Sequence, residues 1–148
     1  MGSARTKSRP NMPAVSADAP AASSVLVIDD EPMIGRVVKR MYGKYGQVHV
    51  ETDARVALAR IASGESFDVI FCDLMMPGCN GMEFYGALAT SHPETTSRVV
   101  FMTGGACNEA AESFLARVKN MQLPKPFDTA ALLEITRAVV RAHAPSER

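Results

Sequence analysis

Short apolar runs recur along most of the chain, and each is followed directly by a polar residue. Three of them contain only apolar residues, at positions 25–28, 69–72 and 99–102. Continuous apolar runs of this length are typical of strands buried on both faces of a parallel sheet. The segment 47–50 alternates polar and apolar residues, which favours a strand at the sheet edge. A fifth, shorter strand is predicted at 121–123.

The segments between these runs have the spacing of amphipathic helices. In 32–45 the apolar side chains recur at helical intervals, Pro32 suits a first turn, and Gly46 breaks the pattern. Asp53 can cap a second helix that reaches residue 62. Further helices are predicted from Gly81 to just before Pro93, over 108–118, and over 128–143 with Asp128 as its cap.

A strand followed by a helix thus occurs five times. This alternation predicts an α/β fold of the flavodoxin-like (βα)5 type, with helices on both faces of a parallel sheet. The three apolar strands should be central and the alternating one at an edge. The expected strand order is therefore 2-1-3-4-5.

Length and composition limit the organisation and the surroundings of the chain. Its 148 residues, 47% of them apolar, suffice for one core. Residues 1–23 are rich in Ala, Ser and Pro and are predicted to be a disordered tail or linker, which leaves one domain over 24–148. No apolar stretch has the length of a membrane span. The net charge of zero argues against direct nucleic-acid binding.

The three cysteines also bear on the compartment. Cys72, Cys79 and Cys107 are odd in number and lack C-x-x-C spacing. This pattern argues against a disulfide scaffold or a structural zinc site and favours the reducing cytoplasm.

The polar residues beyond the strand ends form a chemical pattern. Asp29 and Asp30 follow the first strand, Asp73 the third, Thr103 the fourth and Lys125 the fifth. Because parallel strands place their carboxyl ends on one edge of the sheet, these side chains should converge. Clustered carboxylates suit Mg²⁺, and a carboxylate can act as the nucleophile that forms an aspartyl phosphate.

Four motifs carry a resemblance to a known family. They are V-L-V-I-D-D-E-P at 25–32, D-L-M-M-P-G-C-N-G at 73–81, M-T-G-G at 102–105 and L-P-K-P-F at 123–127. In this order they resemble the receiver domain of two-component response regulators, the family of CheY. The resemblance covers about residues 24–143. The same motifs also resemble those of receivers attached to hybrid histidine kinases.

The resemblance implies a role for each matching residue. Asp73 would accept the phosphoryl group and also bind Mg²⁺. Asp30 would bind the ion directly, Asp29 would support it through water, and the backbone carbonyl of Met75 would supply another ligand. Thr103 and Lys125 would contact the phosphoryl group.

Two features beside Lys125 follow from the same resemblance. The Lys125–Pro126 peptide is usually cis in the family. Three residues before the lysine the family often has an aromatic residue that moves on activation, whereas this chain has Gln122. The aromatic half of the switch is therefore absent.

The expected function is that of a phosphoacceptor rather than an enzyme. Its partners would be a histidine kinase or a histidine phosphotransfer protein, together with a downstream protein target. The chain would be either a stand-alone regulator or the terminal receiver of a hybrid kinase.

Three other functions fit less well. An aspartyl-phosphate hydrolase of the haloacid dehalogenase type needs a second Asp two residues after the nucleophile, where this chain has Met75. A flavodoxin-like flavin carrier needs a first loop that binds phosphate, which Asp29, Asp30 and Glu31 would repel. A degenerate receiver acting as a static interaction module would not need the complete set of acids, Thr103 and Lys125.

Overall fold

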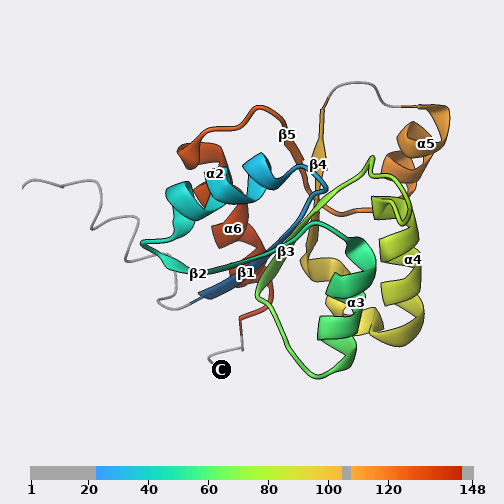
Figure 1. Cartoon of the computed structure of the whole chain (residues 1–148), viewed down its shortest axis with the longest axis horizontal. Coiled ribbons are helices and arrows are strands. Elements are labelled where there is room, and N and C mark those ends of the chain that lie inside the picture. The colour runs from blue at the N-terminus through green and yellow to red at the C-terminus, as the bar shows by residue number, and fades with distance from the viewer. Residues whose placement is uncertain (1–22, 105–107, 145–148) are drawn as a thin grey trace, which may run out of the picture.

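A computed structural model describes residues 23–104 and 108–144 of the chain. Five parallel strands form one sheet in the order β2-β1-β3-β4-β5, which confirms the predicted topology (Figure 1). The strands are β1 (Ser23–Ile28), β2 (Gly46–Glu51), β3 (Val69–Asp73), β4 (Val99–Thr103) and β5 (Gln122–Pro124). The three apolar strands are the central ones, since β2 and β5 lie at the edges.

Helices cover both faces of this sheet. On one face lie α2 (Pro32–Tyr42) and α6 (Thr129–Ala142). On the other lie α3 (Ala54–Ala62), α4 (Gly81–Ser91) and α5 (Glu109–Arg117), and a 3-10 helix, η2 (Pro93–Arg98), leads into β4 (Figure 1). The predicted alternation of strands and helices is therefore confirmed.

Each face of the sheet has its own apolar core. On the side of α3, α4 and α5, three aromatic rings pack edge to face or tilted, with centroids 5.2 to 5.6 Å apart: Tyr85, Phe101 and Phe114. On the other side, Val27 and Phe71 pack with Leu132 of α6. Burying a side chain of this size contributes about 1.5–3 kcal/mol, so both layers hold the sheet in place.

Side-chain caps fix where four helices begin. Asp53, Asn80, Asn108 and Asp128 each accept a hydrogen bond from a backbone N–H of the first turn that follows. The cap of α4 is a full capping box, because Glu83 accepts in return from the backbone of Asn80. A cap of this kind contributes about 1 kcal/mol. The start of α4 is thus set close to the end of β3.

Several boundaries differ from the sequence prediction by one to three residues. Helix α2 ends at Tyr42 instead of residue 45, because a turn bonded from Tyr45 N–H to the Tyr42 carbonyl follows it, with Gly43 and Gly46 nearby. Strand β1 begins at Ser23, two residues before the predicted run 25–28, and β5 begins one residue later than predicted, at Gln122. The predicted tail otherwise lies outside the described residues.

None of the helices within the described ranges 23–104 and 108–144 has the length and apolar character needed to cross a membrane.

Candidate functional site: an acidic pocket at the carboxyl edge of the sheet

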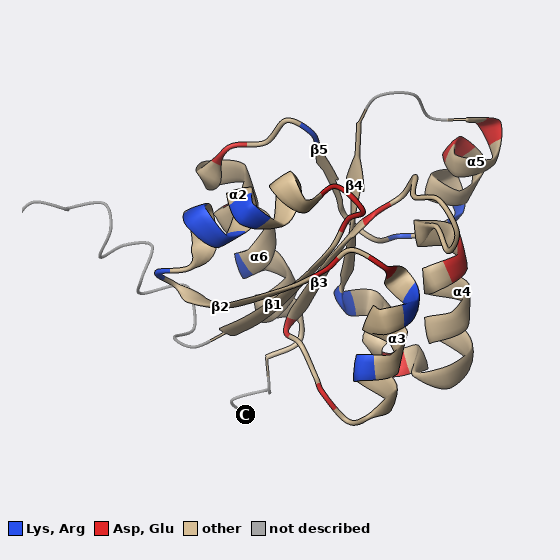
Figure 2. Ribbon diagram, viewed as in Figure 1, with Lys and Arg blue, Asp and Glu red and all other residues tan. Residues whose placement is uncertain are grey.

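The sheet brings the predicted polar residues to one edge. Asp29 directly follows β1, Asp73 is the last residue of β3, and Thr103 is the last residue of β4. Lys125 directly follows β5, and its backbone N–H donates to the Thr103 carbonyl at 2.6 Å. Because β1, β3, β4 and β5 are successive neighbours, their carboxyl ends lie side by side at one edge of the sheet (Figure 2). The site formed there is called the acidic pocket below.

Three carboxylates meet in this pocket. Asp29, Asp30 and Asp73 each place one carboxylate oxygen within 4.8 Å of the others. Asp29 is 1% and Asp73 8% exposed, whereas Asp30 is open to solvent. The cluster therefore has a buried floor and one accessible side.

Lys125 is the cation of this cluster. Its Nζ lies 2.7 Å from Oδ2 of Asp29 and 3.3 Å from Oδ1 of Asp73. Gly104 leaves room for the stem of Lys125, since an added Cβ would lie 3.0 Å from the Lys125 Cβ, a tight contact. The Lys125–Pro126 peptide is cis, as the resemblance implied.

One ammonium does not balance three carboxylates. Burial, and then the charge of Asp29, raise the pKa of Asp73 to about 6, although Lys125 opposes the shift. Burial alone would lower the pKa of Lys125, but the hydrogen bond to Asp29 and the charges of Asp73 and Asp29 outweigh it and raise that pKa. The pocket thus carries excess negative charge that favours a further cation.

The donor set of the pocket fits Mg²⁺. The carboxylate oxygens are hard ligands, and the exposed side at Asp30 leaves room for water or phosphoryl oxygens in the remaining positions. Met75, two residues after Asp73, is 37% exposed in the loop that follows β3.

The remaining residues singled out from the sequence differ in burial and in their distance from the three carboxylates along the fold. Thr103 is half-buried beside the pocket, and Gln122 is exposed on β5, paired in register with Phe101. Cys72 is fully buried, and burial raises the pKa of its thiol well above its usual value. Gly105 and Cys107 lie outside the described residues.

Sequence reasoning did not identify the carboxylate partners of Lys125. The contact of Lys125 with a phosphoryl group stays a prediction, and in the structure the shorter of its two carboxylate contacts is with Asp29. Asp29 Oδ1 also accepts the backbone N–H of Glu31 at 2.9 Å, which ties the carboxylate to the start of α2. The position of Asp29 directly after a fully apolar strand indicates a buried carboxylate, and a buried carboxylate needs a cationic partner such as Lys125.

The family model for the response regulator receiver domain matches residues 25–137. The chain belongs to this family. It is therefore a receiver domain of the two-component type, with the phosphoacceptor signalling role that is standard for such domains.

Two curated relatives are response regulators. The chain is 28% identical over 115 residues to the response regulator protein FleR of Pseudomonas aeruginosa, covering 77% of this chain and 24% of that protein. It is 27% identical over 120 residues to the response regulator ArlR of Staphylococcus epidermidis, covering 80% and 53%. The chain thus spans about a quarter to half the length of these relatives.

Among solved structures, a chemotaxis protein CheY4 of Vibrio cholerae superposes with a TM-score of 0.69 at 29% sequence identity, covering 80% of this chain and 99% of that one. A crystal structure of NtrX from Brucella abortus in complex with ADP gives a TM-score of 0.69 at 26% identity, covering 82% of this chain and 27% of that one. Both likenesses agree with the family and with the CheY-like fold.

Proposed function

We propose that Asp73 is the phosphoacceptor of this receiver domain. The observation that carries the proposal is the position of its carboxylate, at the end of the central strand β3, within reach of Asp29, Asp30 and Lys125. Two other functions are disfavoured by the chemistry of the residues. A haloacid dehalogenase-type hydrolase needs an Asp as general acid where this chain has Met75, and the acidic loop after β1 would repel the phosphate of a flavin.

The reaction is a phosphoryl transfer from a phosphohistidine. The P–N bond of the donor breaks while a P–O bond forms to a carboxylate oxygen of Asp73. The electron pair remains on the imidazole nitrogen, which takes up a proton. Asp73 must react ionised; burial raises its pKa in the metal-free pocket, and a bound cation would oppose that shift.

Mg²⁺ held by Asp29, Asp30 and Asp73, with the Met75 carbonyl, would neutralise charge on the transferring group. Lys125 is placed to hold a phosphoryl oxygen once Asp73 is modified, because its Nζ already lies 3.3 Å from Oδ1 of Asp73. Thr103, at the end of the neighbouring strand, offers a hydroxyl for another oxygen. The chain's own groups thus position and stabilise the product.

The partners follow from this chemistry. The phosphoryl donor is a histidine kinase or a histidine phosphotransfer protein. The target of the signal is a downstream protein. The reaction takes place in the cytoplasm, where ATP-dependent kinases act. The chain itself is modified by phosphorylation and is regenerated when the aspartyl phosphate is hydrolysed, so it acts as an acceptor instead of turning over a separate substrate. Exposed Gln122 leaves no aromatic ring on β5 to move, so the proposed output route runs through β4 and α5.

The acceptor is tested with acetyl phosphate and Mg²⁺, followed by intact-protein mass spectrometry. We expect the wild type to gain the mass of one phosphoryl group and Asp73→Asn to gain none. Glu31→Gln, an exposed acid beside the pocket, is the matched control and should label like the wild type. Undiminished labelling of Asp73→Asn would place the acceptor elsewhere.

A further inference from the structure

A small cavity lies at the amino edge of the sheet, at the end opposite to the acidic pocket. Its volume is about 160 Å³, and it lies between the start of β4, the turn before β5 and the last turns of α6. Four apolar side chains line it: Val99, Met121, Val139 and Ala142. Val99 and Val139 are buried, whereas Met121 is 43% exposed, so part of this wall borders solvent. Apolar walls of this kind favour an alkyl group over water. The site is called the amino-edge cavity below.

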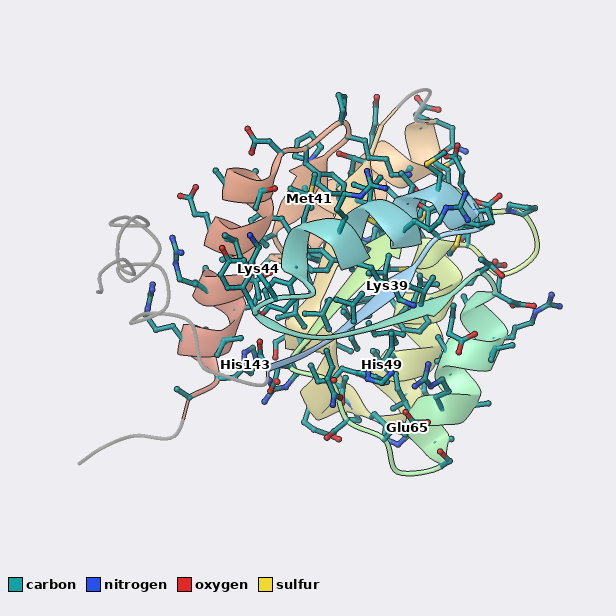
Figure 3. The ribbon with its side chains drawn as sticks, turned by 60° about the vertical axis from the view of Figure 1, so that its left-hand side comes forward. Lys39, Met41, Lys44, His49, Glu65 and His143 are labelled. Atoms are coloured by element: carbon teal, nitrogen blue, oxygen red, sulfur yellow. The ribbon has the colours of Figure 1, made fainter. Side chains whose placement is uncertain are left out.

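Hydrogen bonds fix the polar residues around this cavity. The ring of His143, labelled in Figure 3, donates from Nδ1 to the Val139 carbonyl at 2.9 Å, since a carbonyl can only accept. Its Nε2 is then free to accept from Oγ of Ser97 at 2.7 Å. Asn120 donates through Nδ2 to two backbone carbonyls of the segment 96–99, at 2.8 and 2.7 Å. These contacts tie α6, η2 and the turn before β5 together, so the cavity is pre-formed and a ligand has little order to impose.

Lys119 gives the cavity its charge. The side chain is exposed, lines the cavity and forms no ion pair within the described part of the chain. Among the described residues, no acidic side chain lines the cavity. The carbonyls at the end of α6 do not offset this charge, because the Val139 carbonyl accepts from the His143 ring and the Val140 carbonyl accepts the His143 backbone N–H. The amino-edge cavity therefore combines apolar walls with one ammonium group.

We propose that the amino-edge cavity binds a short aliphatic carboxylate, with its chain against the apolar walls and its carboxylate on Lys119. The volume sets the chain length, because it is about five times the roughly 30 Å³ that a water molecule occupies in the liquid. A methylene group is of similar size, so a chain of about five carbons fills the cavity, as in hexanoate. Each buried methylene raises the affinity by about fourfold, which gives a dissociation constant on the order of 1 mM.

The test is a titration of the full chain at pH 7.5, followed by NMR of the Met121 methyl group and the Ser97 backbone amide. Sodium hexanoate is the main probe. Butanoate and octanoate vary the chain length on either side of it, and 1-hexanol keeps the chain without the charge. Sedimentation at several protein concentrations shows whether a second copy of the chain covers this face. The site lies at the other edge of the sheet from Asp73, so the result does not depend on the proposed function.

Two variants change the cavity, and each has a matched control. Lys119→Gln removes the cation, and Arg141→Gln removes an exposed cation of α6 that does not line the cavity. Ala142→Leu fills the cavity from the last turn of α6 with a residue that favours helix. Ala116→Leu makes the same exchange at an exposed position of α5 away from the cavity. Thermal melts verify that all four variants fold.

We expect hexanoate to bind about sixteenfold more tightly than butanoate, with no further gain for octanoate. Lys119→Gln should weaken hexanoate about threefold and leave 1-hexanol unchanged. Ala142→Leu should weaken both by about tenfold or more, and both controls should stay within about twofold of the wild type. Equal binding of hexanoate and 1-hexanol, or wild-type affinity for hexanoate in Ala142→Leu, would overturn the proposal. Shifts of Met121 that follow self-association and not hexanoate would assign this face to a second copy of the chain and also overturn it.

Discussion

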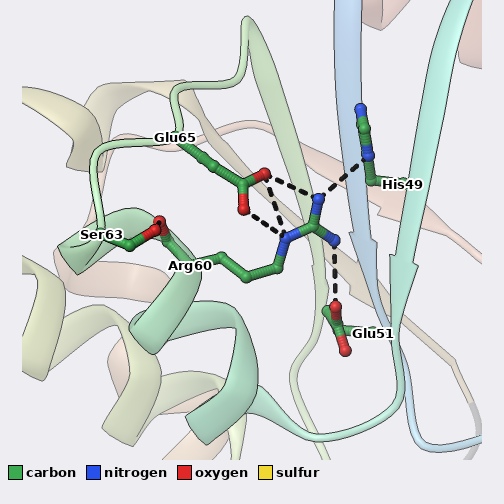
Figure 4. A network of polar contacts seen from close by, with 5 residues as sticks. All are labelled: His49, Glu51, Arg60, Ser63 and Glu65. Carbon is green, nitrogen blue, oxygen red and sulfur yellow. Dashed lines mark hydrogen bonds and ion pairs between the residues drawn. The ribbon is translucent and has the colours of Figure 1, made fainter.

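Two charged clusters of this domain are built in opposite ways. In the acidic pocket, three carboxylates share the single ammonium of Lys125. At the other cluster, the guanidinium of Arg60 on α3 is surrounded by acceptors: its Nη1 lies 3.0 Å from Glu51, and its Nη2 lies 2.7 Å from Glu65 and 3.1 Å from Nδ1 of His49 (Figure 4). Its Nε also donates to Glu65.

The pKa values of the carboxyls move in opposite directions in the two clusters. Burial raises the pKa of Asp73, whereas the hydrogen bond from Arg60 lowers the pKa of Glu65. In the Arg60 cluster one guanidinium serves two carboxylates, but both carboxylates are partly open to solvent and bond to it directly, and the cation also lies 5.4 Å from the Phe67 ring. The Arg60 cluster holds α3, β2 and the loop before β3 together, whereas the acidic pocket keeps a capacity to bind a cation.

The largest expected effect comes from removing the uncompensated charge at Asp73. With its pKa raised to about 6, the folded protein binds more protons than the unfolded chain between about pH 4 and pH 6. Stability therefore falls as the pH rises through this window, and the ionised form costs on the order of 3 kcal/mol at neutral pH. Asp73→Asn should stabilise the metal-free protein by that order in urea titrations at pH 7.5.

The same variant has a built-in control. Below about pH 4, where Asp73 is protonated in both states, the stabilisation by Asp73→Asn should vanish. Added Mg²⁺ should raise the stability of the wild type more than that of the variant. Equal stability of Asp73→Asn and the wild type at pH 7.5 would show that the ionised Asp73 carboxylate does not destabilise the metal-free protein.

The second effect concerns the cation that the imbalance attracts. Asp30→Ala should weaken Mg²⁺ binding by about tenfold or more, equivalent to about 1.4 kcal/mol, because it removes the exposed carboxylate of the cluster. Calorimetric titration measures the affinity, with Glu31→Ala as the neighbouring control outside the three-carboxylate cluster. Wild-type affinity in Asp30→Ala would remove this residue from the metal site.

The two clusters also differ in how far the sequence reveals them. The pocket could be predicted because each of its residues directly follows an apolar strand, and parallel topology forces strand ends together. The Arg60 cluster could not, because it joins β2, α3 and a loop through contacts that leave no local pattern. The Lys125–Asp29 contact was missed for a similar reason, since spacing alone does not decide which of two nearby carboxylates a lysine prefers.

A third prediction tests the Arg60 cluster. Arg60→Met keeps an apolar stem against Phe67 but leaves Glu51 and Glu65 without their cation. We expect a loss of about 1 kcal/mol, since all these groups remain partly solvated. Urea titrations with and without Mg²⁺ should give the same loss, in contrast to Asp73→Asn. A loss that depends on Mg²⁺ would mean that the two clusters are coupled.

The smallest expected effect belongs to His49, the neutral member of the Arg60 cluster. Its Nδ1 accepts a hydrogen bond from Arg60 Nη2 at 3.1 Å. Arg60 Nη2 also donates a shorter hydrogen bond, of 2.7 Å, to Glu65. The ring also packs edge-on against Phe67, with centroids 5.4 Å apart. His49→Gln, which retains an acceptor, and His49→Phe, which retains the ring contact, therefore each remove only one of two interactions.

Each of these His49 variants should lose about 0.5 kcal/mol or less, because Glu65 and water can satisfy the released N–H of Arg60. Thermal and urea unfolding at neutral pH measure the loss, and Arg60→Met provides the upper reference. A loss in His49→Phe as large as that of Arg60→Met would show that the hydrogen bond from His49 holds the guanidinium in place. The charges of Glu51 and Glu65 would then not suffice to orient Arg60, and the cluster would depend on its neutral acceptor as much as on its ion pairs.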